Sequence, residues 1–151
     1  YLPADPNANF KILPKDTNQV ISLEGKILIM DDDPNVIKTL QSYLVKMGGQ
    51  VTTTNRGEEA LIHYIQALKS NDPYDLVFLD LTVVGGMDGD KTMKKLLEID
   101  PNVKAIVTSG YSDKKILTNY AQFGFQGVLP KPYTLNQLNA LLVEHLVQKT
   151  N

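Results

Sequence analysis

Short apolar runs alternate along the chain with longer segments in which apolar residues recur at helical spacing. The runs predict β-strands, and the segments between them predict helices. The apolar runs predicted as strands are Lys26–Asp31, Asp75–Asp80, Val103–Thr108 and Phe125–Leu129, and the short, β-branched segment Gln50–Thr54 is predicted as a further strand. The predicted helices span about 34–47, 57–69, 89–98 and 112–123, with a last one after Thr134. This alternation predicts an α/β fold with a parallel sheet and helices on both faces.

Residues at the ends of the predicted helices support these boundaries. Asp33, Asp88 and Thr134 stand where a helix N-cap is expected. Gly48-Gly49 and Gly124 stand where helices should end. The last helix should bury an apolar stripe, made of Leu135, Leu138, Leu141, Leu142 and Leu146.

Residues 1–24 lack this regular pattern. Proline and asparagine recur in them, which is typical of a linker or a terminal arm. We therefore expect an arm over 1–24 and one domain over 25–151.

Composition narrows the classes of function. Charged residues make up 21% of the chain and the net charge is −2, so we expect no nucleic acid partner. The absence of cysteine excludes disulfides and thiolate metal sites. No apolar stretch is long enough to span a bilayer, and no segment resembles a signal peptide. We expect a cytoplasmic domain without direct membrane contact, which is compatible with a membrane-anchored parent protein.

Polar side chains follow the predicted strands, where the carboxyl ends of parallel strands should meet at one edge of the sheet. They are Asp31-Asp32-Asp33, Asp80, Thr108-Ser109 and Lys131. Carboxylates gathered at such an edge need a cation, and oxygen ligands without histidine or cysteine favour Mg²⁺. A carboxylate beside that ion can act as a nucleophile and form an acyl phosphate. A lysine and a hydroxyl could then neutralise the phosphoryl oxygens.

Each of these residues also has a purely structural interpretation. Asp33 is best explained as a helix cap. Lys131 taken alone would be an exposed loop lysine. Asp80 is harder to explain in this way, because it interrupts the apolar run LVFLDLTVV, where an unpaired carboxylate would be costly.

The motifs ILIMDDDP, DLVFLD, IVTSGY and VLPKP, in this order, resemble those of response-regulator receiver domains. The resemblance covers roughly residues 25–150. It implies a flavodoxin-like (βα)5 three-layer sandwich with a parallel five-stranded sheet in the order 2-1-3-4-5. It also implies a two-component phosphorelay function, in which a phosphohistidine supplies a phosphoryl group to an aspartate.

By this resemblance, Asp31 and Asp32 form the acidic pair that holds Mg²⁺. Asp80 is the aspartate that accepts the phosphoryl group and also binds the metal. Thr82 contributes its backbone carbonyl to the metal site.

The same resemblance assigns Thr108 as the switch hydroxyl and Lys131 as the lysine that contacts the phosphoryl group. Pro132 should follow Lys131 through a cis peptide bond. Two positions depart from the common pattern. Gly89 lies nine residues after the acceptor rather than eight, and Val128 replaces an aromatic residue that rotates in many receivers.

The longer loop resembles that of receivers in hybrid sensor kinases, and Tyr1-Leu2-Pro3-Ala4 resembles the last strand of a kinase ATP-binding domain. We therefore expect the C-terminal receiver of a hybrid histidine kinase. Its partner would be a kinase dimerisation domain or a histidine-phosphotransfer protein. Docking should use the predicted helix Pro34–Met47, through whichever of Val36, Ile37 and Leu40 is exposed, and the Lys131–Tyr133 loop.

Three other functions fit the sequence less well. A haloacid-dehalogenase-like phosphatase needs a second aspartate two residues after the nucleophile, where Thr82 stands. A phosphorylation-independent interaction module would have no need of Asp31, Asp32, Asp80, Thr108 and Lys131. A DNA-binding regulator would need a further domain, for which the chain up to Asn151 leaves no room. As an enzyme, the domain is expected only to promote its own aspartyl phosphorylation and dephosphorylation. His63 and His145 should lie on helices away from the acidic cluster.

Overall fold

The computed structural model describes residues 24–83, 87–110 and 118–147, in which five parallel strands form one sheet in the order β2-β1-β3-β4-β5. The strands are β1 (Lys26–Met30), β2 (Gln50–Thr54), β3 (Leu76–Asp80), β4 (Ala105–Ser109) and β5 (Gly127–Pro130). The helices are α1 (Pro34–Lys46), α2 (Gly57–Lys69), α3 (Gly89–Ile99), the short η1 (Tyr120–Phe123), α5 (Leu135–Leu142) and the π-helical η2 (Val143–Val147). The predicted flavodoxin-like class and strand order are confirmed.

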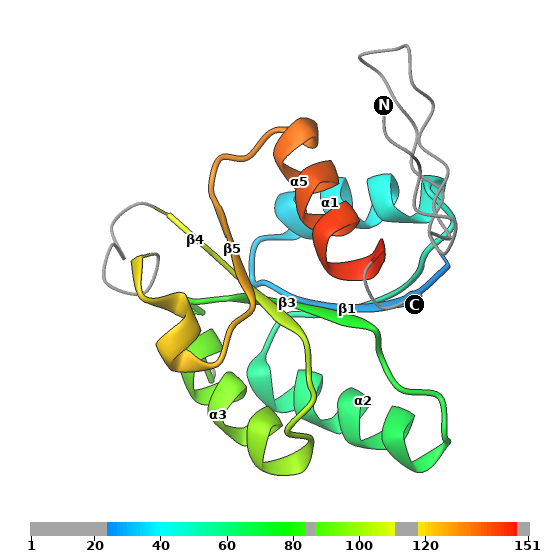
Figure 1. The fold of residues 1–151 in the computed structure, drawn as a ribbon, viewed down its shortest axis with the longest axis vertical. Helices are drawn as coiled ribbons and strands as arrows, with labels where there is room; N and C mark the ends of the chain where they lie inside the picture. The colour runs from blue at the N-terminus through cyan, green and yellow to red at the C-terminus, as the bar shows by residue number, and fades with distance from the viewer. Residues whose placement is uncertain (1–23, 84–86, 111–117, 148–151) are drawn as a thin grey trace.

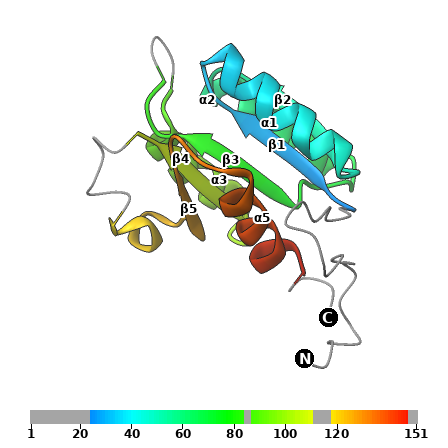
Figure 2. The same ribbon diagram turned by 90° about the horizontal axis from the view of Figure 1, so that it is seen from above.

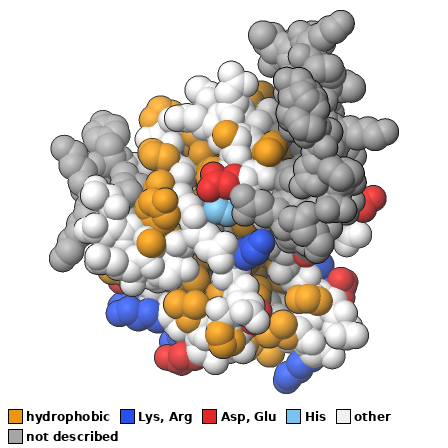
Figure 3. All heavy atoms as spheres, viewed as in Figure 1, with side chains coloured by type: hydrophobic (Ala, Val, Ile, Leu, Met, Phe, Trp, Pro, Cys, Tyr) orange, Lys and Arg blue, Asp and Glu red, His pale blue; other side chains and the backbone are white. Residues whose placement is uncertain are grey.

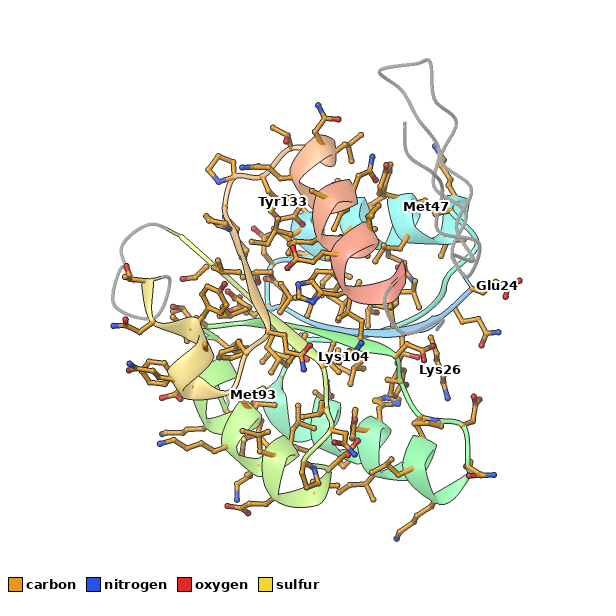
Figure 4. The ribbon with its side chains drawn as sticks, viewed as in Figure 1. Glu24, Lys26, Met47, Met93, Lys104 and Tyr133 are labelled. Atoms are coloured by element: carbon orange, nitrogen blue, oxygen red, sulfur yellow. The ribbon has the colours of Figure 1, made fainter. Side chains whose placement is uncertain are left out.

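Helices α1 and α5 cover one face of the sheet, and α2 and α3 cover the other (Figure 1). Seen from above, β4 and β5 lie at one side of the sheet and β1 and β2 at the other (Figure 2). Successive residues of β1 serve different layers: Ile27 packs toward α1 and α5, and Leu28 packs toward α2 and α3. Met47 at the end of α1 and Met93 on α3 lie on opposite sides of the sheet (Figure 4). Burial on both faces explains why the inner strands β1, β3 and β4 are mostly apolar.

The predicted helix caps are present. The Asp33 carboxylate accepts a hydrogen bond from the Asn35 N–H at 2.9 Å, and the Asp88 carboxylate accepts one from the Lys91 N–H at 3.1 Å. Thr134 and Gln137 form a reciprocal capping box at the start of α5. These caps start α1, α3 and α5 close to the carboxyl end of the sheet, where the polar residues gather.

The last two strands begin later than their apolar runs predicted. Val103 and Phe125 are buried, but their backbone N–H groups bond within the preceding turns, to Asp100 and Tyr120. Each residue therefore packs into the core before its strand starts. Leu135 is also an exception: its side chain is 51% exposed, because it opens α5 outside the buried stripe.

Part of the predicted fourth helix lies outside the described residues, which resume at residue 118. Its last turn is the 3₁₀ helix η1, and Gly124 ends it in the left-handed conformation, with φ at 97°. Residues 1–23 of the arm predicted over 1–24 also lie outside the described residues, so the domain boundary stays a prediction.

Large exposed apolar side chains are scattered over the described surface. Val45, Ile62, Ile99 and Leu135 belong to four different helices. The face drawn in Figure 3 shows apolar groups in several separate places. A search of the described helices finds none with the length and apolarity that crossing a membrane requires.

Candidate functional site

The carboxyl ends of three strands bring the predicted polar residues to one place. Asp31 directly follows β1, Asp80 is the last residue of β3, and Lys131 follows β5. Thr108 in β4 pairs in register with Asp80. The sheet thus assembles residues that are up to 100 positions apart in the sequence.

Asp31, Asp32 and Asp80 form the acidic part of the site. One oxygen from each carboxylate lies within 4.8 Å of the others. Opposite ligands of an octahedral Mg²⁺ are about 4.2 Å apart, since each Mg–O bond is about 2.1 Å long. The three oxygens therefore converge to nearly the spread that one such cation requires, and their hard donor chemistry suits it.

Asp33 and Thr82 are two further residues near the predicted metal site, and their positions differ. Asp33 is exposed and caps α1, as its structural interpretation predicted. Thr82 lies two residues beyond β3 and is exposed, so its side chain is not part of the core. The role of its backbone carbonyl in binding metal stays a prediction.

Lys131 connects two of the buried carboxylates. Its ammonium nitrogen Nζ lies 2.7 Å from Asp31 Oδ2 and 3.3 Å from Asp80 Oδ1. Asp31 is further held by the Asp33 backbone N–H, which donates to Asp31 Oδ1 at 2.9 Å. The Lys131–Pro132 peptide bond is cis, as the resemblance implied.

Burial and like charge shape the electrostatics of Asp80. Desolvation and, after it, the neighbouring Asp31 carboxylate raise the pKa of Asp80 to about 6, although Lys131 opposes both effects. For Lys131, burial alone would lower the pKa, but its hydrogen bond to Asp31 and the charges of both aspartates raise it. The lysine therefore stays charged beside a carboxylate that would otherwise tend to take up a proton.

The hydroxyl of Thr108 is buried next to this pair. It donates to the Leu79 carbonyl across a long distance of 3.5 Å, so little energy would be lost if it turned toward another acceptor. Ser109 is also buried, and its hydroxyl donates to the Gly110 carbonyl at 3.2 Å.

Val128 occupies the position of the common aromatic switch. It is half-buried and packs against the core cluster on the α2 and α3 side of the sheet. A branched aliphatic side chain offers no ring that could rotate between an inner and an outer position.

Gly89 fixes the approach of α3 to Asp80. A Cβ atom at this position would lie 2.5 Å from the Asp80 carbonyl oxygen, closer than van der Waals contact allows. Glycine at the first turn of α3 thus lets the helix start directly against the end of β3. Residues 84–86 of the preceding loop lie outside the described residues.

An open groove of about 480 Å³ adjoins the site between the start of α1 and the segment before α5. Its lining residues are Asp33, Asn35, Val36, Thr39, Lys131, Pro132 and Tyr133. Tyr133 lies where the chain enters α5 (Figure 4). Of the three docking candidates on α1, Leu40 is buried and Ile37 packs against the core, which leaves Val36 in the groove.

The two histidines, His63 and His145, lie outside the acidic site. His63 lies on α2, and His145 is buried in η2. Among the described residues, the group of side chains suited to a metal ion contains neither of them.

Comparisons with known proteins place the chain in a family. The model of the response regulator receiver domain matches residues 27–143. The chain is 29% identical to the transcription factor SKN7 of Candida albicans, over 87% of this chain and 22% of that protein. It is 27% identical to the sporulation initiation phosphotransferase F of Bacillus subtilis, over 85% of this chain and 99% of that protein.

A solved structure supports the same assignment. It is the CheX–CheY–BeF3–Mg²⁺ complex from Borrelia burgdorferi, with 25% identity, a TM-score of 0.73, and coverage of 83% of this chain and 91% of that one. The chain belongs to the response regulator receiver domains. It is a phosphorelay receiver of the two-component class, and receivers bind Mg²⁺ at an acidic pocket such as the aspartate cluster described above.

Proposed function

We propose that Asp80 accepts a phosphoryl group from a phosphohistidine, with Mg²⁺ held by Asp31, Asp32, Asp80 and the Thr82 carbonyl. The observation that carries this proposal is the contact of Lys131 with both Asp31 and Asp80 at the carboxyl edge of the sheet. It combines a buried nucleophile with a fixed positive charge, the pairing that phosphoryl transfer requires.

The transfer exchanges one bond for another. An Asp80 carboxylate oxygen forms a bond to phosphorus, while the bond from phosphorus to the imidazole nitrogen of the donor breaks. The imidazole leaves with the electron pair of that bond. When bound, Mg²⁺ neutralises charge on the transferred group and on the surrounding carboxylates. Asp31 and Asp32 supply the negative charge that retains such a cation beside the nucleophile.

Lys131 and Thr108 provide the response to phosphorylation. Lys131 already lies 3.3 Å from Asp80 Oδ1, so its ammonium is placed to contact a phosphoryl oxygen attached to that carboxylate. The Thr108 hydroxyl can exchange its weak bond to Leu79 for a charged acceptor. Both movements shift the loops after β4 and β5, so the signal travels without an aromatic ring at position 128.

The donor docks in the groove between α1 and the Lys131–Tyr133 segment. A histidine of this kind lies on a helix of a kinase dimerisation domain or of a histidine-phosphotransfer protein. The groove is next to Lys131 and presents Val36 and Pro132 to such a helix. An apolar contact at this place would hold the donor in line with Asp80.

The parent protein is a hybrid histidine kinase, in which residues 1–24 connect the end of the kinase domain to this receiver, and the receiver works in the cytoplasm. The longer loop before Gly89 and the segment Tyr1-Leu2-Pro3-Ala4 support this proposal. The alternative, an interaction module that works without phosphorylation, is less favoured, because it gives no role to the pairing of Lys131 with two buried carboxylates.

Mass spectrometry after treatment with acetyl phosphate and Mg²⁺ tests the acceptor. We expect the mass of one phosphoryl group on the wild type and on the control Asp72→Asn, whose carboxylate is exposed and pairs with Lys26. Asp80→Asn should stay unmodified while keeping its fold by circular dichroism. Comparable labelling of Asp80→Asn would place the chemistry elsewhere, and an unlabelled wild type would favour the interaction module.

Titration with Mg²⁺ tests the metal site separately. Amide NMR shifts around Asp32 and Asp80 should respond to millimolar Mg²⁺ in the unphosphorylated protein. If other regions respond instead, the metal site is wrong even where Asp80 is phosphorylated.

A further inference from the structure

The helical turn η2, which follows α5, buries a histidine against the sheet. His145 is only 8% exposed, and a Cβ atom on Gly127 of β5 would lie 2.9 Å from its ring nitrogen Nε2. Atoms of Ile106 and Leu141, which are both uncharged, lie 2.9 and 3.2 Å from the same point. Glycine at position 127 therefore leaves a slot between β4, β5 and α5, and the imidazole of His145 lies in it.

The Nε2 atom of His145 has no hydrogen-bond partner among the described residues, although it is buried. The Glu144 carboxylate oxygen Oε2 lies 3.8 Å from it, which is beyond hydrogen-bonding distance. A neutral imidazole loses little by this, because only one of its two nitrogens carries a proton. A protonated imidazole carries a proton on both nitrogens, so the slot would then bury a positive charge and a donor without an acceptor.

Two charged residues act on this ring, and their effects are opposite. Glu144 belongs to the same turn and favours the protonated ring, but its side chain is largely exposed. Lys104 precedes β4 and lies beneath the turn in the view of Figure 4, and its ammonium donates to the His145 carbonyl at 3.2 Å. Burial lowers the pKa of His145, Glu144 opposes this, and the positive charge of Lys104 lowers the pKa further.

We propose that His145 makes the attachment of η2 to the sheet sensitive to pH. The neutral imidazole stays in its slot and holds the turn on β5, whereas protonation drives the ring toward solvent and loosens the turn. Leu146, the next residue, is buried in the core cluster that includes α1, so a loosened turn exposes apolar surface at the end of the domain. This inference does not depend on the metal site.

The direction of the pH effect follows from the two states of the turn. In the open turn His145 is solvated and has the ordinary pKa of 6.5, while burial lowers the pKa in the closed turn. The open turn therefore binds a proton more readily, and opening increases as the pH falls below about 6.5. Asp80 titrates in the same range, but its raised pKa means that protonation favours the folded state, so it cannot cause the same loss.

Hydrogen exchange of the backbone amides in η2 measures this opening. In the wild type, protection factors corrected for the intrinsic pH dependence of exchange should fall between pH 7.5 and pH 5.5, by up to about tenfold. Tenfold is the limit because a solvated histidine is protonated about ten times as often as it is neutral at pH 5.5. His145→Leu fills the slot with a side chain that cannot be protonated, so its protection should stay constant. The control His63→Gln removes the histidine of α2 and should behave like the wild type.

Imidazole NMR signals provide a second readout that needs only the wild-type protein. As the pH falls, the His145 ring should take up its proton in step with the loss of protection in η2. An equal loss of protection in His145→Leu and in wild type would assign the change to another group and overturn the proposal. Wild-type amides that stay protected at pH 5.5, whether or not the His145 ring is protonated, would overturn it as well. If His145→Leu does not fold, the wild-type comparison of ring and amides decides alone.

Discussion

Lys131 Nζ lies 2.7 Å from Asp31 Oδ2, although 100 residues separate the two in the sequence. The same nitrogen lies 3.3 Å from Asp80 Oδ1. Both aspartates are almost fully buried, with 2% and 4% of the residue surface exposed. One positive ammonium group thus faces two buried negative carboxylates. Asp32 adds a third carboxylate, so the site keeps an excess of negative charge. The unphosphorylated, metal-free site is therefore electrostatically strained, and several consequences can be measured.

Asp80→Asn should stabilise the metal-free protein. The raised pKa of Asp80, about 6 against 3.8, means that the folded state favours the protonated form and pays a penalty for the carboxylate. At pH 7.5 in EDTA, removing the charge should raise the free energy of unfolding by about 1–3 kcal/mol. The gain should shrink as the pH falls from 6 toward 4, because wild-type Asp80 then takes up a proton in the folded protein.

Urea unfolding at pH 7.5 and pH 4.5 measures this effect. Asp72→Asn is the matched control, since its carboxylate is largely exposed and should change stability little at either pH. A gain that is equal at both pH values would show that Asp80 is not under electrostatic strain.

Lys131→Met should strengthen Mg²⁺ binding. The ammonium competes with a cation for Asp31 and Asp80, so its removal should raise Mg²⁺ affinity about three- to tenfold. The same change should lower the stability of the metal-free protein, because two buried carboxylates lose their partner. Isothermal titration with Mg²⁺ checks the affinity, with Lys69→Met, an exposed lysine at the end of α2, as control. Weaker Mg²⁺ binding in Lys131→Met would mean that the lysine organises the carboxylates more than it repels the metal.

The sequence predicted which polar side chains lie together better than it predicted their surroundings. Asp31, Asp80 and Lys131 could be placed together because parallel strands bring their carboxyl ends to one edge, whatever the loops do. The separate role of Asp33 as a cap followed from its position before Pro34. These inferences need only the periodicity of the strands and the hydrogen-bonding chemistry of a helix start.

Features that depend on the path of a loop could not be predicted. The contact of Glu58 with Met87 joins two segments whose separation is set by the β3–α3 loop, which has no periodic pattern. The starts of β4 and β5 were misplaced because Val103 and Phe125 are apolar and buried while still in turns. The choice of Val36 over Ile37 and Leu40 likewise required the angle at which α1 packs on the sheet.

Thr108→Ala should separate phosphorylation from its structural response. Asp80 and the acidic cluster remain, so acetyl phosphate should still modify the protein. The hydroxyl that would turn from Leu79 toward the phosphoryl group is missing, so much of the spectral change after phosphorylation should be lost. Amide NMR spectra before and after phosphorylation, for wild type, Thr108→Ala and Thr108→Ser, measure this. Matching changes in Thr108→Ala and wild type would contradict the role of the hydroxyl, and Thr108→Ser should restore most of the response.

If the donor docks in this groove, a substitution there should affect a protein phosphodonor but not a small-molecule phosphodonor. Val36 lines the groove beside Lys131, whereas Val45 lies on the same helix outside it and is 52% exposed. Val36→Lys places a charge where an apolar contact with the donor helix is expected, so phosphotransfer from a phosphorylated histidine-phosphotransfer protein should slow severalfold. Acetyl phosphate does not use that contact, so its reaction should stay close to the wild-type rate.

Val45→Lys adds the same side chain to α1 without touching the groove, and it should match wild type with both donors. Single-turnover transfer, followed by loss of label from the phosphohistidine protein, gives the rates. If Val36→Lys slows both donors equally, the substitution has damaged the acidic site rather than the docking face. If it slows neither while Val45→Lys slows the protein donor, the donor helix docks on a different part of α1 and the groove has another use.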